Sequence, residues 1–192
     1  MTPFLIVGLG NPGKKYETTR HNAGFLFLDF LHKEGNFPEF SQNERFHSSL
    51  SEGSFDGQKI ILAQPETFMN LSGNAIEKLI SFYKIPLEHL AVIHDDLDIA
   101  LGTFRTATNS RSAGHNGVQS IIDRLGSQTF RRFRLGIRIP TDIENSQSKI
   151  PSDRFVLEPF PENELRPLRS IFPEIQTALE AWIQTEEMSN VS

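Results

Sequence analysis

The 192-residue chain contains no cysteine. Structural disulfides, thiolate metal sites and a cysteine nucleophile are therefore excluded, and a reducing cytoplasm is the compartment that we expect. No apolar run approaches the ~20 residues that a membrane span requires. The apolar start, residues 4–10, has no basic region before it and is followed by Asn-Pro-Gly-Lys-Lys. It therefore predicts a buried first strand and not a signal sequence.

The chain also lacks an overall excess of basic charge, since its net charge is −5. Taken alone, this argues against a nucleic-acid partner, because phosphate binding depends on Lys and Arg. The basic residues are unevenly distributed, however: residues 101–140 contain seven Arg and one acid, Asp123. This stretch indicates a localised site for an anionic ligand, although any of the Arg between 131 and 138 can equally be a solvent-facing position of a strand.

The residues that are present predict one α/β domain over residues 1–192, with a mixed, twisted β-sheet packed on both faces by helices. With 38% hydrophobic residues, the chain can enclose a sizeable core. Asp56-Gly57, between two strand-like stretches, favours a hairpin turn, so part of the sheet is antiparallel. The expected strands are 3–9, 48–55, 59–64, 90–94 and 133–139; the expected helices are 23–31, 72–83, 118–125 and 162–187, the last interrupted by Pro167 and Pro173.

Gly8, Gly10 and Gly13 form the G-x-G-x-x-G pattern of dinucleotide-binding folds, directly after the first predicted strand. That pattern requires a helix to begin at once, so that its N-terminus meets the pyrophosphate. Here Pro12 and a polar run delay the helical pattern to residue 23. Asp29, which has the spacing of a ribose-binding acid, falls inside that helical pattern and not at a strand end. A dehydrogenase is therefore the weaker interpretation.

His21 is the candidate general base. It lies in a polar loop before a helix, and the ordinary imidazole pKa of ~6.5 is already close to what a base needs at neutral pH. A carboxylate on the second ring nitrogen would fix its tautomer, and Asp95, Asp96 and Asp98 follow a buried strand from which one of them could reach it. The alternatives for these acids are a helix cap, a surface turn or a magnesium site, and no further acids cluster with them to favour the metal.

Asn11, Asn70 and Asn116 lie on three separate loops. Each could be a cap or turn residue. An amide both donates and accepts hydrogen bonds, so three of them could also hold a carbonyl, a ribose hydroxyl or a water without adding charge. One imidazole among uncharged amides suits cleavage by water without a covalent nucleophile.

These residues carry a resemblance to a known family. Residues 8–13, 19–24, 67–73, 94–98 and 114–117, together with Tyr16, resemble the successive signature blocks of bacterial peptidyl-tRNA hydrolases, in order and spacing, from residue 3 to about residue 160. The resemblance implies a monomeric α/β enzyme of translation, without metal or cofactor. It would hydrolyse the ester between a peptide and the 3′ ribose of tRNA, releasing both for recycling.

The resemblance also implies roles for individual residues. His21 would activate water, Asp95 would stabilise its charged form, and Asn11 would help to distinguish a blocked peptidyl group from a free aminoacyl group. The tRNA end and the peptide would be held by Tyr16, Phe68, Asn70 and Asn116.

Arg105 and the Arg-rich strand beyond it are expected to contact phosphates of the tRNA acceptor arm without reading sequence. The loop after Arg105 departs from the family's pattern: Ala107 stands where relatives often have a second basic residue, and Arg111 could replace that charge. A non-catalytic RNA-binding protein of the same fold is the remaining alternative. His21, Asp95 and the three Asn argue against it, since a binding module needs no base.

Overall fold

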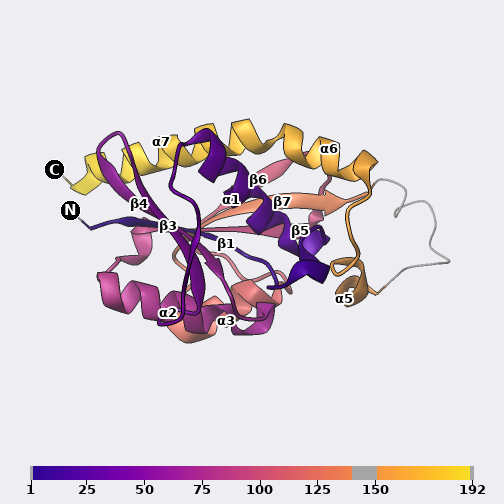
Figure 1. The fold of residues 1–192 in the computed structure, drawn as a ribbon, viewed down its shortest axis with the longest axis horizontal. Coiled ribbons are helices and arrows are strands. Elements are labelled where there is room, and N and C mark those ends of the chain that lie inside the picture. The colour runs from indigo at the N-terminus through magenta and orange to yellow at the C-terminus, as the bar shows by residue number, and fades with distance from the viewer. Residues whose placement is uncertain (1, 140–150, 191–192) are drawn as a thin grey trace.

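A computed structural model describes residues 2–139 and 151–190, and its centre is a seven-stranded sheet in the order β2-β3-β4-β1-β5-β7-β6 (Figure 1). β4, β1, β5 and β7 run parallel to one another, while β2, β3 and β6 pair antiparallel toward the two edges. The predicted mixed sheet is therefore confirmed. The strands are β1 (Phe4–Gly8), β2 (Ser41–Asn43), β3 (Ser48–Phe55), β4 (Gln58–Pro65), β5 (Leu90–Ala100), β6 (Phe104–Ala107) and β7 (Arg131–Arg138).

Helices cover both faces of the sheet, as predicted (Figure 1). Because successive side chains of a strand point to opposite faces, β1 contributes Phe4 and Ile6 to one apolar core and Leu5 and Val7 to the other. The first core includes side chains from α1 (Ala23–Glu34), α6 (Glu162–Ser170) and α7 (Phe172–Asn190). The second includes side chains from α2 (Ser72–Tyr83) and α3 (Asn116–Leu125).

The local sequence signals account for several boundaries. Asp56 and Gly57, at φ values of 47° and 81°, form the predicted turn between β3 and β4, since a two-residue hairpin turn favours positive φ at both positions. α2 has the predicted bounds, and α3 ends at Gly126 with φ of 63°. The C-terminal helix is in two pieces, but the break falls at Ile171 and Pro167 lies within α6.

Two expectations were incomplete. β5 continues through the acidic run to Ala100, whereas the prediction ended the strand at residue 94. Two of these acids are buried and paired, so the strand accommodates charges that looked like its end. The short edge strands β2 and β6 were not predicted. The delayed start of the first helix is confirmed, because the turns η1 (Lys14–Tyr16) and η2 (Arg20–Asn22) separate the glycine pattern from α1, and this delay disfavours a dinucleotide site.

The topology places a crevice at the carboxyl ends of β1 and β5. After β1 the chain continues to β2, β3 and β4 on one side of the sheet, whereas after β5 it continues to β6 and β7 on the other. Ligands of open α/β sheets bind where neighbouring connections diverge in this way. Within residues 2–139 and 151–190, no helix has the length and apolar character to cross a bilayer.

Candidate active site

His21 lies in η2, between β1 and α1, with 7% of its surface exposed. Its backbone N–H donates to the carbonyl of Val156 at 2.8 Å, in the segment that follows the short helix α5 (Ser152–Phe155). The neighbouring Arg20 N–H donates to the carbonyl of Glu158 at 3.1 Å. The backbone that carries His21 is therefore fixed by a segment more than 130 residues away in sequence.

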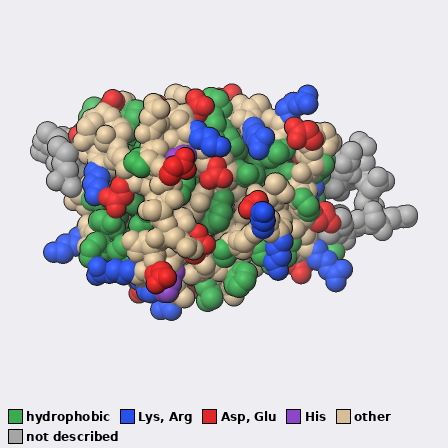
Figure 2. Space-filling view, in the orientation of Figure 1, with side chains coloured by type: hydrophobic (Ala, Val, Ile, Leu, Met, Phe, Trp, Pro, Cys, Tyr) green, Lys and Arg blue, Asp and Glu red, His purple; other side chains and the backbone are tan. Residues whose placement is uncertain are grey.

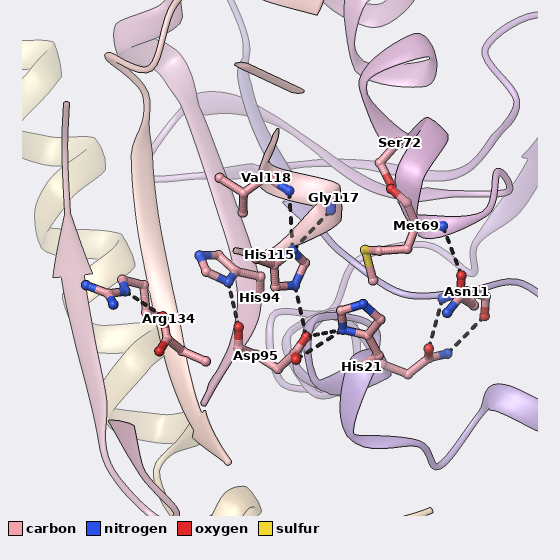
Figure 3. Close-up of polar contacts among 12 residues, drawn as sticks. Asn11, His21, Met69, Ser72, His94, Asp95, His115, Gly117, Val118 and Arg134 are labelled. Atoms are coloured by element: carbon pink, nitrogen blue, oxygen red, sulfur yellow. Dashed lines mark hydrogen bonds and ion pairs between the residues drawn. The ribbon is translucent and has the colours of Figure 1, made fainter. Parts of the chain in front are cut away.

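The His21 ring contacts Asp95 on β5 (Figure 3). Nδ1 lies 2.9 Å from Asp95 Oδ1 and 3.1 Å from Oδ2. Burial lowers the pKa of His21, but the charge of Asp95 and its hydrogen bond raise it by more, so this pKa lies above its ordinary value of 6.5. Burial raises the pKa of Asp95, yet the adjacent histidines hold it well below its usual range. The carboxylate is thus ionised and accepts the Nδ1–H of His21.

A second imidazole, His115, binds the same carboxylate and escaped prediction. It is the N-cap of α3: its Nδ1 accepts from the backbone N–H groups of Gly117 and Val118, at 3.1 Å and 3.3 Å. Because backbone N–H groups only donate, Nδ1 carries no proton and the proton of the neutral ring is on Nε2. That Nε2–H donates to Asp95 Oδ1 at 3.0 Å. The start of α3 thereby fixes the tautomer of His115 and orients Asp95 toward His21.

The arrangement leaves one imidazole nitrogen available for chemistry. With Nδ1 of His21 donating to Asp95, the neutral ring has its lone pair on Nε2. No hydrogen bond to Nε2 is found among the described residues, and His21 lines a cavity of about 400 Å³. A water in that cavity could donate to Nε2. His21 therefore has the geometry of a general base whose tautomer is fixed by Asp95.

His21, Asp95 and His115 also offer ligand atoms close enough together for a metal ion, all within 4.8 Å. The hydrogen bonds disfavour this use. Nε2 of His115 would have to lose its proton while Nδ1 still accepts from two N–H groups, which only an imidazolate could do. The acidic run offers no better magnesium site, since Asp96 binds the guanidinium of Arg134 at 2.7 Å.

Asn11 connects three segments at the crevice. Its backbone N–H and carbonyl bind the side-chain amide of Asn22 at 2.9 Å and 3.0 Å, and its Oδ1 accepts from the backbone N–H of Met69 at 2.9 Å. Met69 begins the turn η3 (Met69–Leu71), which contains Asn70. Because the N–H of Met69 only donates, the oxygen of Asn11 faces it and the Nδ2 group is left as a donor. Asn22 is a further structural residue that we did not predict.

The structure groups some of the predicted site residues and separates others. His21, Asp95 and Asn116 line the 400 Å³ cavity, and Asn11 is joined to its surroundings through Asn22, the neighbour of His21. Asn11 itself does not line the cavity, and neither do four other predicted residues. Three of them are exposed and Tyr16 is half-buried: Tyr16 in η1, Phe68 and Asn70 around η3, and Arg105 on β6.

The Arg-rich strand is only partly available to an anionic ligand. Arg132 is 1% exposed, and its guanidinium donates to the backbone carbonyls of Ser110 and Arg111. This side chain supports the loop after β6, so our expectation of a phosphate contact is wrong for Arg132. Arg105 is exposed and pairs in register with Arg134 on β7. The guanidinium of Arg134 is already paired with Asp96, so at this register position it is Arg105, on the edge strand, that keeps the features of a phosphate contact.

The two roles of His115 can be separated by substitution. His115→Asn retains a helix-capping side chain, whereas His115→Ala removes both the cap and the contact with Asp95. We expect kcat to fall about tenfold in both variants, because a hydrogen bond to a charged group is worth about 1.5 kcal/mol. Only His115→Ala should lose a further ~1 kcal/mol of unfolding free energy. Unchanged kcat in His115→Asn would contradict the role given to His115 in orienting Asp95.

Comparison with known proteins identifies one family. A sequence model described as peptidyl-tRNA hydrolase matches residues 5–192. The "Peptidyl-tRNA hydrolase" of Bacillus pumilus is 43% identical over 184 residues, which cover 96% of this chain and 90% of the relative, and that of Oceanobacillus iheyensis is 41% identical over 180 residues, covering 94% and 92%. The crystal structure of peptidyl-tRNA hydrolase from Acinetobacter baumannii superposes with a TM-score of 0.86 at 32% identity, covering 98% of this chain and 92% of that one.

Proposed function

The chain belongs to the peptidyl-tRNA hydrolase family, and we propose that it cleaves the ester between a peptide and the 3′ ribose of tRNA with a water activated by His21. The enzyme hydrolyses peptidyl-tRNA and releases tRNA and peptide. The observation that carries the proposed mechanism is the imidazole of His21, with Nδ1 bound to Asp95 and Nε2 at a cavity.

The proposed step is a direct hydrolysis. His21 Nε2 takes a proton from water as the water oxygen forms a bond to the ester carbonyl carbon. The bond from that carbon to the ribose 3′ oxygen then breaks, and the proton passes from His21 to the leaving oxygen. Asp95 stabilises the imidazolium that exists between these two transfers. No covalent bond to the enzyme forms.

Uncharged amides surround this step. Asn116 lines the cavity beside His21, so it can donate to the carbonyl oxygen as negative charge develops there. The free Nδ2 of Asn11 can donate to a carbonyl but would face the positive charge of an unblocked α-amino group. This difference supports a role for Asn11 in selecting blocked substrates.

The remaining predicted residues fit a surface for the tRNA end. The exposed ring of Phe68, 55% accessible, is suited to stacking on a base, with Tyr16 and Asn70 as further contacts. Arg105 would bind a phosphate of the acceptor arm. We further propose that the enzyme acts as a monomer in the cytoplasm, where peptidyl-tRNA is its macromolecular partner.

The proposed function is tested by release of free tRNA from one N-acetyl-aminoacyl-tRNA in the presence of EDTA. Hydrolysis that persists in the chelator supports a water-driven reaction without metal. Hydrolysis that stops and returns on adding a divalent ion would contradict it. Binding of tRNA without hydrolysis would favour the non-catalytic RNA-binding alternative.

Asp95→Asn should shift the pH dependence of kcat/KM in a direction that the structure determines. The acid limb of kcat/KM reports protonation of the free enzyme's base. Removing the carboxylate removes the charge that raises the pKa of His21, so the acid limb should move to lower pH. The plateau rate should also fall, because Asn can hold Nδ1 in the wrong tautomer. A limb at the parent's pH would contradict the Asp95–His21 coupling.

A further inference from the structure

The cavity beside His21 is acidic. Its lining includes four aspartates and no Lys or Arg among the described residues: Asp95, Asp96, Asp98 and Asp153. Asp95 is bound by two imidazoles, and Asp96 is paired with Arg134. Within the described part of the chain, no ion pair or side-chain hydrogen bond is found for the exposed carboxylates of Asp98 and Asp153. This cavity therefore carries uncompensated negative charge.

His21, the proposed general base, lines this same cavity. Only 7% of the His21 surface is exposed. Its Nε2, which has no hydrogen-bond partner among the described residues, is the catalytic nitrogen of the proposed mechanism. The scissile ester must therefore lie at the cavity, with one of its two substituents directed into it. The substituents differ in charge, since the tRNA side carries phosphates and the peptidyl side need not.

The charge of the cavity indicates which of the two substituents of the ester enters it. Carboxylates repel phosphate groups, so the terminal nucleotides are disfavoured in the acidic cavity. The η3 turn offers them an uncharged alternative, with the exposed Phe68 and Asn70. The peptidyl substituent is then directed toward Asp98 and Asp153.

Resting on the function proposed above, we propose that the cavity receives the side chain of the esterified amino acid. Asp98 and Asp153 then make the enzyme favour substrates in which that side chain is cationic. Lysine and arginine have the length and charge to approach carboxylates beyond the ester. A carboxylate side chain at the same position would be repelled, and a neutral side chain of lysine's length would gain nothing.

The test uses one tRNA body acylated with N-α-acetyl-lysine, N-acetyl-norleucine or N-acetyl-glutamate, so that all contacts with the tRNA are shared. We expect kcat/KM for the lysyl ester to exceed that for the norleucyl ester by about fivefold at low salt, with the glutamyl ester slowest. The lysine preference should decline as salt screens the carboxylates. Equal kcat/KM for the lysyl and norleucyl esters would overturn the inference.

Variants identify the carboxylates responsible. Asp98→Asn and Asp153→Asn should each reduce the lysine-to-norleucine ratio about twofold, and the double variant should abolish the preference. Asp123→Asn is the matched control, since Asp123 is an exposed acid of α3 outside the cavity lining and should leave the ratio unchanged. A ratio that survives in the double variant would overturn the assignment. A parent enzyme that cleaves none of the three esters would instead contradict the proposed function itself.

Discussion

Replacing His21 by alanine is expected to reduce kcat by about 10²- to 10⁴-fold, the usual share of a general base. The substitution removes Nε2, the proton acceptor, and leaves His115 as the partner of the Asp95 carboxylate among the residues that the structure describes. The main-chain bond from residue 21 to Val156 needs no side chain, so the segment should keep its place. KM and tRNA affinity should change little, because the contacts proposed for phosphates and bases lie elsewhere. Steady-state kinetics with N-acetyl-aminoacyl-tRNA measure the first quantity and filter binding the second.

A matched control separates chemistry from packing. His32, on α1, is 7% exposed, as His21 is, but it lies outside the cavity lining. His32→Ala should therefore lose stability with little change in kcat. If His21→Ala retained more than a tenth of the parent's kcat, or lost tRNA binding in parallel with kcat, His21 would not be the base.

Replacing Glu164 by alanine is expected to cost about 3–5 kcal/mol of unfolding free energy, because it takes the buried carboxylate away from a buried guanidinium. Arg20 is 4% exposed, and its Nε and Nη2 donate to Glu164 Oε2 at 3.0 Å and 2.8 Å. Its guanidinium also lies over the ring of Phe155 at 4.1 Å. In a chain of this length the loss corresponds to a fall of roughly 10 °C in Tm. Urea unfolding and calorimetry measure it.

The same arginine provides the control. Arg20 Nη1 reaches Glu158 at 3.3 Å, but the Glu158 side chain is 44% exposed. Glu158→Gln should therefore cost no more than about 1 kcal/mol. A double variant, Arg20→Met with Glu164→Leu, should recover much of the stability lost in Glu164→Ala, since it removes both buried charges. Equal effects of the two glutamate substitutions would contradict the burial assigned to this pair.

Local signals predicted the fold well where the chain's own neighbours decide the structure. The Asp56-Gly57 turn and the bounds of α2 follow from turn chemistry and from apolar spacing within a dozen residues. The extension of β5 does not, because Asp95 and Asp96 are acceptable in a buried strand only through partners that the fold brings from elsewhere. β2 and β6 have three and four residues, too few for a periodic signal.

The residues of the site likewise include some that local sequence signals predict and others that they do not. Two sequence observations, a histidine before a helix and acids after a buried strand, predict that one of three aspartates reaches His21. The choice of Asp95 among them came from the family resemblance, and the structure shows that contact. His115 lay in a block that we singled out, but an imidazole is an unusual N-cap and Asn116 was the more obvious candidate. Arg20 and Glu164 are 144 residues apart, and no local pattern indicates that they pair.

The most direct test of the catalytic assignment is NMR of the protein with isotope-labelled histidine ring nitrogens, titrated through neutral pH. We expect neutral His21 to carry its proton on Nδ1 and to have a bare Nε2, with a pKa above 6.5 that coincides with the acid limb of kcat/KM. A neutral ring protonated on Nε2, or a pKa that differs from the kinetic one, would contradict the assignment of His21 as the base that activates water.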